Sequence, residues 1–495
     1  MSVPTTVRAP SGVPGFDVLL NGGFPQGRMY LLEGRPGTGK TTFALHFCRE
    51  GVAAGERVLY VTLSQRAEEL AEIAASHGWT LDGIDVIDAQ TGGLDLHARG
   101  HTLFETDETD LEDIIDRVLA EVERLRPSRM VLDSAAEIRL LAGDALSSRR
   151  RFLALKHTLG AAGVTTLLVD DYTGQPGDGA VYSIMHGVVR LERDAPAYGD
   201  VYRRLEIPKI RGVNNPTGFH DFQIEPSGII VYPSLSMRLA DGGVADSEGR
   251  SGAAAAPATT RADGLDALLG GGVDRGSSCV VIGVSGTGKS SLAASYAISA
   301  AERGERAAIY TFDERRETLV TRMAGLGYDC RAAGDRLEIR QLSASVMTTG
   351  RFVEEVRAAA DDGVGVVVID SLSGFTDSCP SPGRAATQLH DLLAYLGDRG
   401  VVTFVTVPQH GIIGAQASSE IDVSYIADTV LLLRQFEAEG RVRKALAVVK
   451  RRQGGHDQRV REFVMSDAGL EVGAEISDYQ GVLSGAPVLL GGPVA

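Results

Sequence analysis

Two copies of one sequence pattern occur in this chain, and the repeat limits the possible folds more than any other feature. The segment Gly12–Thr42 matches the segment Thr260–Ser291, with Lys40 aligned on Lys289, a separation of 249 residues (289 minus 40). A chain of 495 residues is also too long for one ordinary domain. We therefore expect a duplicated domain.

The stretch between the two copies has the composition of a linker, because Gly, Ala, Ser and Asp dominate it. We expect an N-terminal domain over residues 1–245, a linker over 246–262 and a C-terminal domain over 263–475. Residues 476–495 end in a Gly- and Pro-rich stretch and are expected to form a loose tail.

Short apolar runs alternate with helical patterns inside each copy. In the first copy the runs are "MYLLE", "RVLYVTL", "RMVLD" and "GVTTLLVD". Apolar residues at helical spacing predict a helix over residues 111–125. Strands that alternate with helices favour a mostly parallel sheet with helices on both faces. The predicted fold class is α/β, with two tandem P-loop NTPase domains.

Each copy contains a glycine-rich phosphate-binding loop. "GRPGTGKT" begins at Gly34 and "GVSGTGKS" begins at Gly283, and both fit G-x-x-x-x-G-K followed by Ser or Thr. Glycines let backbone N–H groups surround phosphate oxygens, and the following helix N-terminus favours anions. A chance glycine-rich turn is disfavoured by the flanking strand and helix and by the two occurrences. The predicted ATP-binding residues are Gly34, Gly37, Thr38, Gly39, Lys40, Thr41 and Thr42, and Gly283, Ser285, Gly286, Thr287, Gly288, Lys289, Ser290 and Ser291.

A magnesium site is predicted beside each loop. Asp133 and Asp370 each end an apolar run, as the acidic residue of a Walker B strand does. The hydroxyls of Thr41 and Ser290 would provide further oxygen ligands for Mg²⁺. The competing interpretation of each aspartate is a polar strand cap.

A pair of carboxylates distinguishes the two copies. Asp313 and Glu314 follow a strand of the second copy, whereas Ser64 and Gln65 occupy the aligned positions of the first. Phosphoryl transfer needs a group that orients or deprotonates the nucleophile, and glutamine cannot accept a proton. We expect the carboxylates at the end of the strand beside the phosphate loop. Alternatively, they only begin a solvated helix.

Taken together, these motifs resemble those of double-domain KaiC proteins, the circadian-clock ATPase and autokinase family of the RecA superfamily. The resemblance rests on the Gly-x-Asp entry to each copy, both phosphate loops, the Asp-Ser strand ends, paired K-x-R segments and "GGHDQRVREFVMSDAGLEV". It implies two RecA-like domains in a homo-hexamer of two stacked rings, with ATP between subunits. It also implies Glu314 as general base beside Asp313.

The same resemblance assigns further roles. It places Lys209, Arg211, Lys450 and Arg452 against the neighbouring subunit's nucleotide, with an exposed strand end as the alternative. It implies a C-terminal serine/threonine autokinase. Because Ser64 and Gln65 replace the carboxylate pair, we expect the N-terminal domain to bind ATP with weak or no hydrolysis.

The phosphorylation site of the family is only partly matched. "DVSYIADTVLLL" places Ser424 at the family's serine position, but Tyr425 replaces the threonine. Ser424 is therefore the candidate phosphosite, and Thr429 is a weaker one.

Charge and composition bear on the alternatives. A net charge of −16 argues against a RecA/DnaB-type DNA-dependent ATPase, and residues 450–461 form the one short basic cluster. A nucleotide-gated scaffold that signals through a KaiB-like or sensor-kinase partner is compatible with ATPase activity. The four cysteines are scattered, and neither a signal peptide nor a membrane span is evident, so we expect a cytoplasmic protein.

Overall fold

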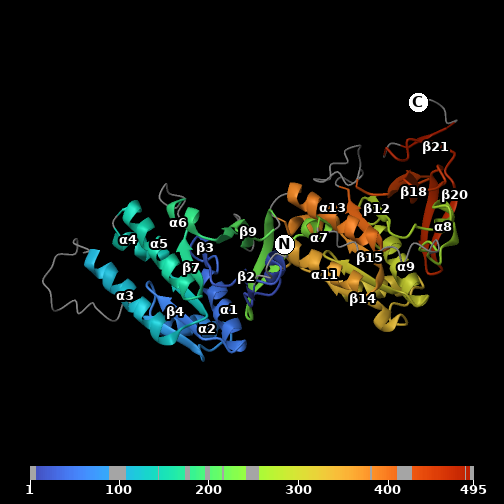
Figure 1. The fold of residues 1–495 in the computed structure, drawn as a ribbon. Helices are drawn as coiled ribbons and strands as arrows, with labels where there is room; N and C mark the ends of the chain where they lie inside the picture. The colour runs from blue at the N-terminus through green and yellow to red at the C-terminus, as the bar shows by residue number, and fades with distance from the viewer. Residues whose placement is uncertain are drawn as a thin grey trace, which may run out of the picture. The chain divides into compact units, whose positions relative to one another are not determined.

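The computed structural model describes residues 7–88, 108–142, 144–172, 179–195, 201–214, 217–240, 256–379, 382–409, 426–484 and 487–490. The chain divides into two compact units, Met1–Met237 and Arg238–Ala495. They are called the N-terminal unit and the C-terminal unit below, and each is described by itself (Figure 1).

The N-terminal unit is built on one nine-stranded sheet in the order β11-β10-β9-β8-β3-β7-β6-β4-β5. The strands from β8 to β5 in this order are parallel, and β9, β10 and β11 continue the sheet as an antiparallel extension. The elements are β1 (Arg8–Ala9), η1 (Asp17–Leu20), β2 (Phe24–Pro25), β3 (Met29–Gly34), α1 (Lys40–Ala53), β4 (Val58–Thr62), α2 (Ala67–Ser76), β5 (Ile84–Asp88), α3 (Glu108–Leu125), β6 (Arg129–Asp133), α4 (Ala135–Ala142), α5 (Ala145–Ala161), β7 (Thr165–Asp171), α6 (Gly179–Ile184), β8 (Gly187–Asp194), β9 (Tyr202–Ile210), β10 (Phe219–Glu225), β11 (Gly228–Tyr232) and α7 (Leu235–Ala240).

The C-terminal unit repeats this topology, with a nine-stranded sheet in the order β14-β13-β15-β16-β12-β17-β18-β19-β20. Its strands β18, β19 and β20 form the antiparallel extension. The elements are α8 (Asp263–Leu268), β12 (Ser278–Gly283), α9 (Lys289–Glu302), β13 (Arg306–Thr311), α10 (Arg316–Gly325), η3 (Gly334–Arg336), β14 (Leu337–Gln341), α11 (Thr349–Asp361), β15 (Val364–Asp370), α12 (Leu372–Asp377), α13 (Pro382–Asp398), β16 (Val402–Pro408), β17 (Thr429–Ala438), β18 (Arg441–Arg451), β19 (Arg461–Ser466), β20 (Gly469–Glu475), β21 (Tyr479–Gln480) and β22 (Val488–Leu489).

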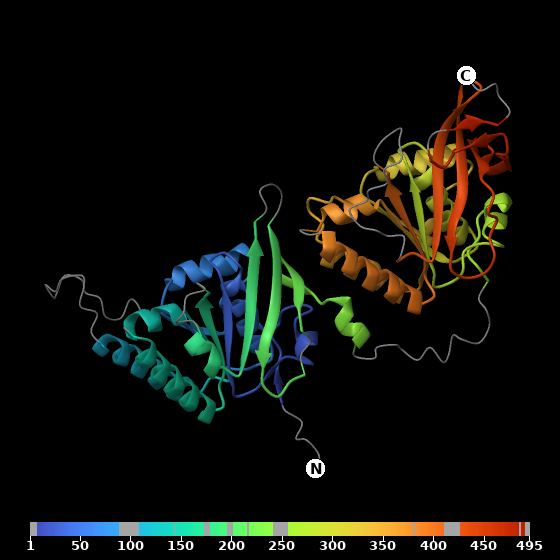
Figure 2. The same ribbon diagram turned by 90° about the horizontal axis from the view of Figure 1, so that it is seen from above.

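Helices cover both faces of each sheet, as the alternating elements predict (Figure 2). In β3, Tyr30 packs toward α1 and α2, whereas Leu31 belongs to the core formed with α3, α4 and α5. Successive side chains of a strand point to opposite faces, which explains why an uninterrupted apolar run is buried on both sides. The helix expected over residues 111–125 lies within α3.

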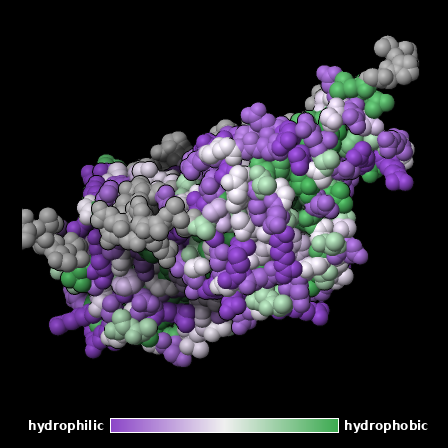
Figure 3. All heavy atoms as spheres, turned by 90° about the vertical axis from the view of Figure 1, so that its right-hand side faces the viewer, coloured by the Kyte–Doolittle hydropathy of each residue, from purple (hydrophilic) through white to green (hydrophobic). Residues whose placement is uncertain are grey.

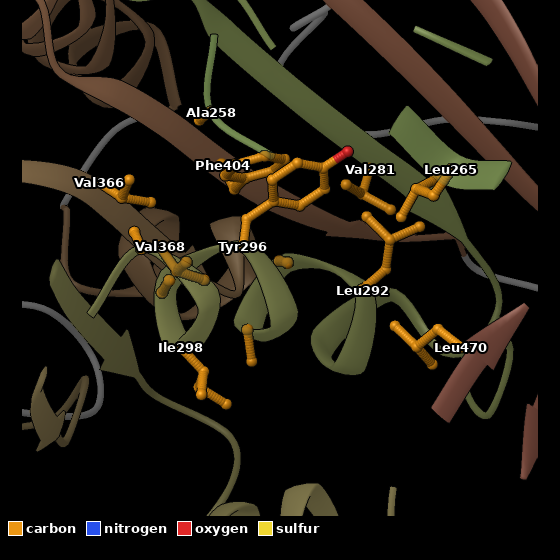
Figure 4. Packing of buried hydrophobic residues seen from close by; sticks show 14 of the residues in the cluster. Ala258, Leu265, Val281, Leu292, Tyr296, Ile298, Val366, Val368, Phe404 and Leu470 are labelled. Carbon is orange, nitrogen blue, oxygen red and sulfur yellow. The ribbon is translucent and has the colours of Figure 1, made fainter. Parts of the chain in front are cut away.

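Aromatic packing anchors the core of the C-terminal unit (Figure 4). The ring of Tyr296 on α9 stacks on Phe404 of β16, with 4.5 Å between the ring centroids. Leu292 and Ile298 of the same helix are fully buried nearby. Burial of each such side chain contributes about 2–3 kcal/mol, so α9 is held firmly against the sheet.

One aspartate, half-buried in the N-terminal unit and buried in the C-terminal unit, stabilises the entry to each unit. Asp17 accepts hydrogen bonds from the backbone N–H of Ser11 at 2.8 and 3.0 Å. Asp266 accepts the equivalent bonds from the N–H of Thr260 and a further one from the hydroxyl of Tyr296 at 3.1 Å. This repeated arrangement is the reason for the Gly-x-Asp pattern in both copies.

The described ends of the expected linker and tail pack against the C-terminal unit. Ala258 is buried and forms an isolated β-bridge with Val273. Val482, in the segment expected to be a loose tail, is 4% exposed and joins a hydrophobic cluster with Phe436 and Ala445.

Much of the surface drawn in Figure 3 is hydrophilic, with hydrophobic side chains in small groups. Among the described residues, no helix is long and apolar enough to cross a membrane.

Candidate functional site

The N-terminal phosphate loop has the predicted strand–loop–helix form. β3 ends at Gly34 and α1 begins at Lys40. Gly39 has a φ of 101°, and a Cβ there would lie 2.7 Å from Ile224 Cδ1. Only glycine fits both conditions without strain. Lys40 Nζ donates to the carbonyls of Gly34 and Arg35 at 2.9 and 3.2 Å, so its ammonium group lies against the first two residues of the loop.

The C-terminal loop is built in the same way between β12 and α9. Gly286 and Gly288 have φ values of 79° and 105°. Lys289 Nζ donates to the carbonyl of Val284 at 2.9 Å, and burial lowers the pKa of this lysine. Placing an anionic phosphate against a partly desolvated ammonium strengthens their attraction.

Several predicted loop residues serve the loop itself. The buried hydroxyls of Thr38 and Thr287 donate to loop carbonyls, at 2.8 and 2.9 Å. The hydroxyl of Thr42 lies 3.3 Å from His77 Nε2, and Ser291 accepts a hydrogen bond from Arg322. These side chains shape and support the loops, while the backbone N–H groups remain the natural phosphate ligands.

A buried aspartate lies beside each loop. Asp133 Oδ2 is 3.5 Å from Thr41 Oγ1 and accepts a hydrogen bond from Tyr60 at 2.7 Å. Burial raises the pKa of Asp133 and also that of Asp370.

A carboxylate and a loop hydroxyl also meet in the C-terminal unit, where Asp370 accepts hydrogen bonds from Ser290 and from Thr406 of β16. A carboxylate and a hydroxyl beside a phosphate loop are the hard oxygen ligands that Mg²⁺ prefers, so both pairs fit this ion.

The position of the carboxylates Asp313 and Glu314 differs from the prediction in one respect. Asp313 and Glu314 follow β13, but β13 is not next to the phosphate-loop strand β12. The strands β15 and β16 lie between them. The expectation of adjacent strands is therefore wrong, because chain order does not reveal sheet order.

Both carboxylates are held in place by neighbours. Glu314 forms a bidentate ion pair with Arg322, at 2.6 Å from Nη2 and 3.2 Å from Nε. Arg322 also donates to Ser291, which links the carboxylate to the helix of the phosphate loop. Asp313 accepts a hydrogen bond of 2.5 Å from Ser371, the residue after Asp370. Glu314 is thus linked to α9, the helix that follows the phosphate loop, and Asp313 to the residue that follows Asp370.

The N-terminal unit keeps the turn but not the carboxylates. Thr62 Oγ1 accepts from the N–H of Gln65 and donates to its carbonyl, just as Thr311 does with Glu314. A carboxylate that sequence reasoning missed lies elsewhere: Asp171 Oδ1 is 2.8 Å from Lys40 Nζ. The signal was present in the sequence, since "GVTTLLVDD" ends in two aspartates.

The K-x-R segments lie at the opposite end of the sheet from the phosphate loop of their own unit. Lys209 donates to the carbonyls of Tyr182 and Ser183, and Arg211 also donates to Ser183. Arg211 N–H donates to the carbonyl of His186, which precedes β8, whereas the loop follows the far end of β3. The six residues of β3 span about 17 Å. Lys209 and Arg211 are therefore far from their own phosphate loop.

The C-terminal pair is placed equivalently. Lys450 donates to the carbonyl of Ala427 at 2.7 Å, and Arg452 pairs with Asp428 at 3.1 Å. Asp428 also receives hydrogen bonds from Ser278, the first residue of β12.

Of the two candidate phosphorylation sites, Ser424 lies outside the described residues, as does Tyr425. Thr429 is the first residue of β17, pairs with Cys279 and is 4% exposed. Its burial makes it a poor acceptor of phosphate.

Acidic partners accompany the short basic cluster. Arg451 pairs with Asp274 at 3.0 Å, and Arg459 pairs with Asp457 at 2.8 Å. These ion pairs lower the positive charge available to a nucleic acid backbone.

Two phosphate loops, each beside a buried aspartate on a mostly parallel sheet, define the class of the chain: a P-loop ATPase with two RecA-like units. A family model described as KaiC ATPase matches residues 9–236 and again residues 258–477. The chain belongs to the KaiC ATPase family.

Proteins with clock functions in their names are similar to this chain over nearly its full length. It is 28% identical to the circadian clock oscillator protein KaiC of Prochlorococcus marinus (strain MIT 9313), over 97% of this chain and 95% of that protein. Identity is also 28% with the protein of that name in Thermostichus vulcanus, over 97% and 92%. It is 26% with the circadian clock protein KaiC3 of Synechocystis sp. (strain ATCC 27184 / PCC 6803 / Kazusa), over 97% and 94%.

Proposed function

We propose that the two units divide the work on ATP. The C-terminal unit hydrolyses ATP and transfers phosphate to a serine of the same protein, and the N-terminal unit binds ATP and hydrolyses it slowly. The observation that carries this proposal is the carboxylate pair Asp313 and Glu314, whose N-terminal counterparts are Ser64 and Gln65. Arg322 links Glu314 to the helix that follows the C-terminal phosphate loop, and Ser371 donates to Asp313.

In the C-terminal unit, Glu314 accepts the proton of the attacking water or serine hydroxyl. Arg322 holds the Glu314 carboxylate in one orientation through a bidentate ion pair. Lys289 and the loop N–H groups stabilise charge on the transferred phosphate. Ser290 and Asp370 would hold Mg²⁺, which neutralises phosphate charge when bound.

The proposed hexamer of two stacked rings rests on the resemblance to the KaiC family, and the positions of the K-x-R pairs support nucleotide sites shared between subunits. Lys209 and Arg211 lie about one strand length from their own phosphate loop, so they contact a nucleotide only if another subunit presents it. Lys450 and Arg452 have the equivalent position. ATP then binds between subunits, and its occupancy controls docking of a partner such as a KaiB-like protein or a sensor kinase.

Ser424 is the proposed acceptor because it matches the serine of the family motif, whereas Thr429 is buried in β17. Phosphopeptide mapping after incubation with Mg²⁺ and ATP tests this assignment. Phosphate on Ser424 is expected, and a phosphorylated chain with unmodified Ser424 would contradict it.

The division of work is tested by separate loop variants. Lys289→Ala should remove most ATP hydrolysis and all autophosphorylation, and Lys40→Ala should remove little of either. Glu314→Gln preserves the shape of the side chain but accepts no proton, so labelling from ATP tagged in its γ-phosphate should disappear. Persistent labelling in Glu314→Gln, or loss of most hydrolysis in Lys40→Ala, would refute the proposal.

A further inference from the structure

The strand next to the N-terminal phosphate loop ends in a carboxylate. β7 pairs in parallel with β3, and the last pair in register is Gly34 with Asp171. The following N–H, from Tyr172, donates to the carbonyl of Gly34 at 3.2 Å. Asp171 is thus fixed by backbone hydrogen bonds at the first residue of the loop.

The Asp171 carboxylate points to the reactive end of the site. Its Oδ1 lies 2.8 Å from Lys40 Nζ, the ammonium that reaches the terminal phosphates in a P-loop. Lys40 is only 10% exposed, whereas Asp171 is 43% exposed. A group in contact with both the loop lysine and solvent is placed where an attacking water must enter.

The C-terminal unit has no carboxylate at the equivalent place. There, Gln409 N–H donates to the carbonyl of Gly283 at 3.0 Å, the same anchoring bond that Tyr172 makes. The residue before it is Pro408, which aligns with Asp171. The candidate carboxylate of the N-terminal unit therefore ends β7, the strand next to the phosphate-loop strand, whereas that of the C-terminal unit follows β13 and is linked to the helix after the loop through Arg322.

We propose that Asp171 is the general base of the N-terminal site and replaces the carboxylate missing at Gln65. This inference rests on the proposed function, in which the N-terminal unit hydrolyses ATP slowly. Asp171 takes a proton from water as the water oxygen bonds to the γ-phosphorus. The bond from that phosphorus to the bridging oxygen breaks, and ADP leaves with the electron pair. Asp171 then passes its proton to solvent, and Lys40 shifts from the carboxylate to the phosphate.

The test uses full-length protein with its C-terminal site inactivated by Lys289→Ala, so that hydrolysis reports the N-terminal site. In this background Asp171→Asn should lower kcat by about 100-fold, the lower end of a positioned base's usual contribution. The KM for ATP and the affinity for the non-hydrolysable analogue AMP-PNP should change by less than about threefold. Binding of ADP with aluminium fluoride, which mimics the transition state, should weaken. Asp171→Glu should restore part of kcat.

Asp194→Asn is the matched control. Asp194 ends β8, the strand on the other side of β3, and its side chain is 55% exposed. The control makes the same change of charge and should leave kcat unaltered. A second background, Glu314→Gln, guards against a folding defect caused by Lys289→Ala.

The outcomes separate the two claims. Wild-type kcat in Asp171→Asn, or tighter ATP binding with unchanged kcat, would show that Asp171 is only a counterion of Lys40 and would overturn the inference. Hydrolysis that requires Lys40 but not Asp171 would leave the proposed function intact. If the N-terminal site with wild-type Asp171 shows no AMP-PNP binding that depends on Lys40, the proposed function itself is contradicted.

Discussion

Acidification should weaken the N-terminal unit through one histidine on the helix of its phosphate loop. His46 lies on α1, is 6% exposed and accepts a hydrogen bond of 2.9 Å from the N–H of Ile229. Its ring packs edge-on against Trp79, with 4.7 Å between centroids. Burial lowers the pKa of His46 to about 4, so the imidazole is neutral in the folded unit.

The size of the effect follows from the two pKa values. Unfolding returns His46 to a pKa of about 6.5, so the unfolded chain binds the additional proton between pH 6.5 and pH 4. Because the unfolded state gains protons there, stability falls as the pH is lowered through this window. Between pH 7 and pH 5 the loss from this group is about 2 kcal/mol. The corresponding shift in the urea midpoint is roughly 1 M.

Tryptophan fluorescence gives a selective assay, because Trp79 is the one tryptophan in the chain. Urea titrations at several pH values should be compared between wild type and His46→Gln, whose amide oxygen still accepts from Ile229. The variant loses ring packing at every pH. Between pH 7 and pH 5, however, its free energy of unfolding should fall by about 2 kcal/mol less than that of the wild type. His157→Gln, at an exposed position on α5, is the control. Equal pH dependence in wild type and His46→Gln would refute the reasoning.

Three further changes test other contacts. Gly374→Ala places a Cβ 2.2 Å from that of Phe312, so the C-terminal unit should lose about 1–3 kcal/mol in thermal unfolding; an unchanged melting temperature would contradict the packing. Arg322→Met removes the ion pair that orients Glu314, so the kcat of the C-terminal site should fall about tenfold with little change in KM. Arg322→Lys should restore part of kcat. A changed KM at constant kcat would argue against a positioning role for Arg322. Burial raises the pKa of Asp266 to about 6, so the folded state binds the extra proton, and this group's contribution to stability falls by about 2 kcal/mol as the pH rises from 4 to 6. Asp266→Asn should remove that pH dependence from the urea stability of the C-terminal unit, and an unaltered pH dependence would refute the reasoning.

Contiguous patterns were enough to predict the fold class and both phosphate loops. A P-loop is read from eight neighbouring residues, and the spacing of apolar residues predicted the helix now seen as α3. The burial of Ala258 and Val482 was not predictable, because the Gly- and Pro-rich stretches around them carry no clear apolar period.

Contacts that depend on sheet order were beyond the sequence. The distance between β13 and β12 could not be known without the order of the strands, and neither could the approach of Asp171 to Lys40. The ion pair of Glu314 with Arg322 could not be predicted without the direction of α10, because the two residues are eight positions apart in the sequence.

The sheet hydroxyl that donates to the buried aspartate, Asp133 or Asp370, comes from different strands in the two halves. Tyr60 on β4 provides it in the N-terminal unit, where the aligned position on β7 is Val169. Thr406 on β16 provides it in the C-terminal unit, where Ile309 of β13 aligns with Tyr60. A chimera that exchanged one of these strands alone would give its buried aspartate either two hydroxyl donors from the sheet or none from it, in addition to Thr41 or Ser290 of the phosphate loop. The two halves therefore differ in which strand supplies this hydroxyl, and exchanging a single strand between them would change the hydrogen bonds of the buried aspartate.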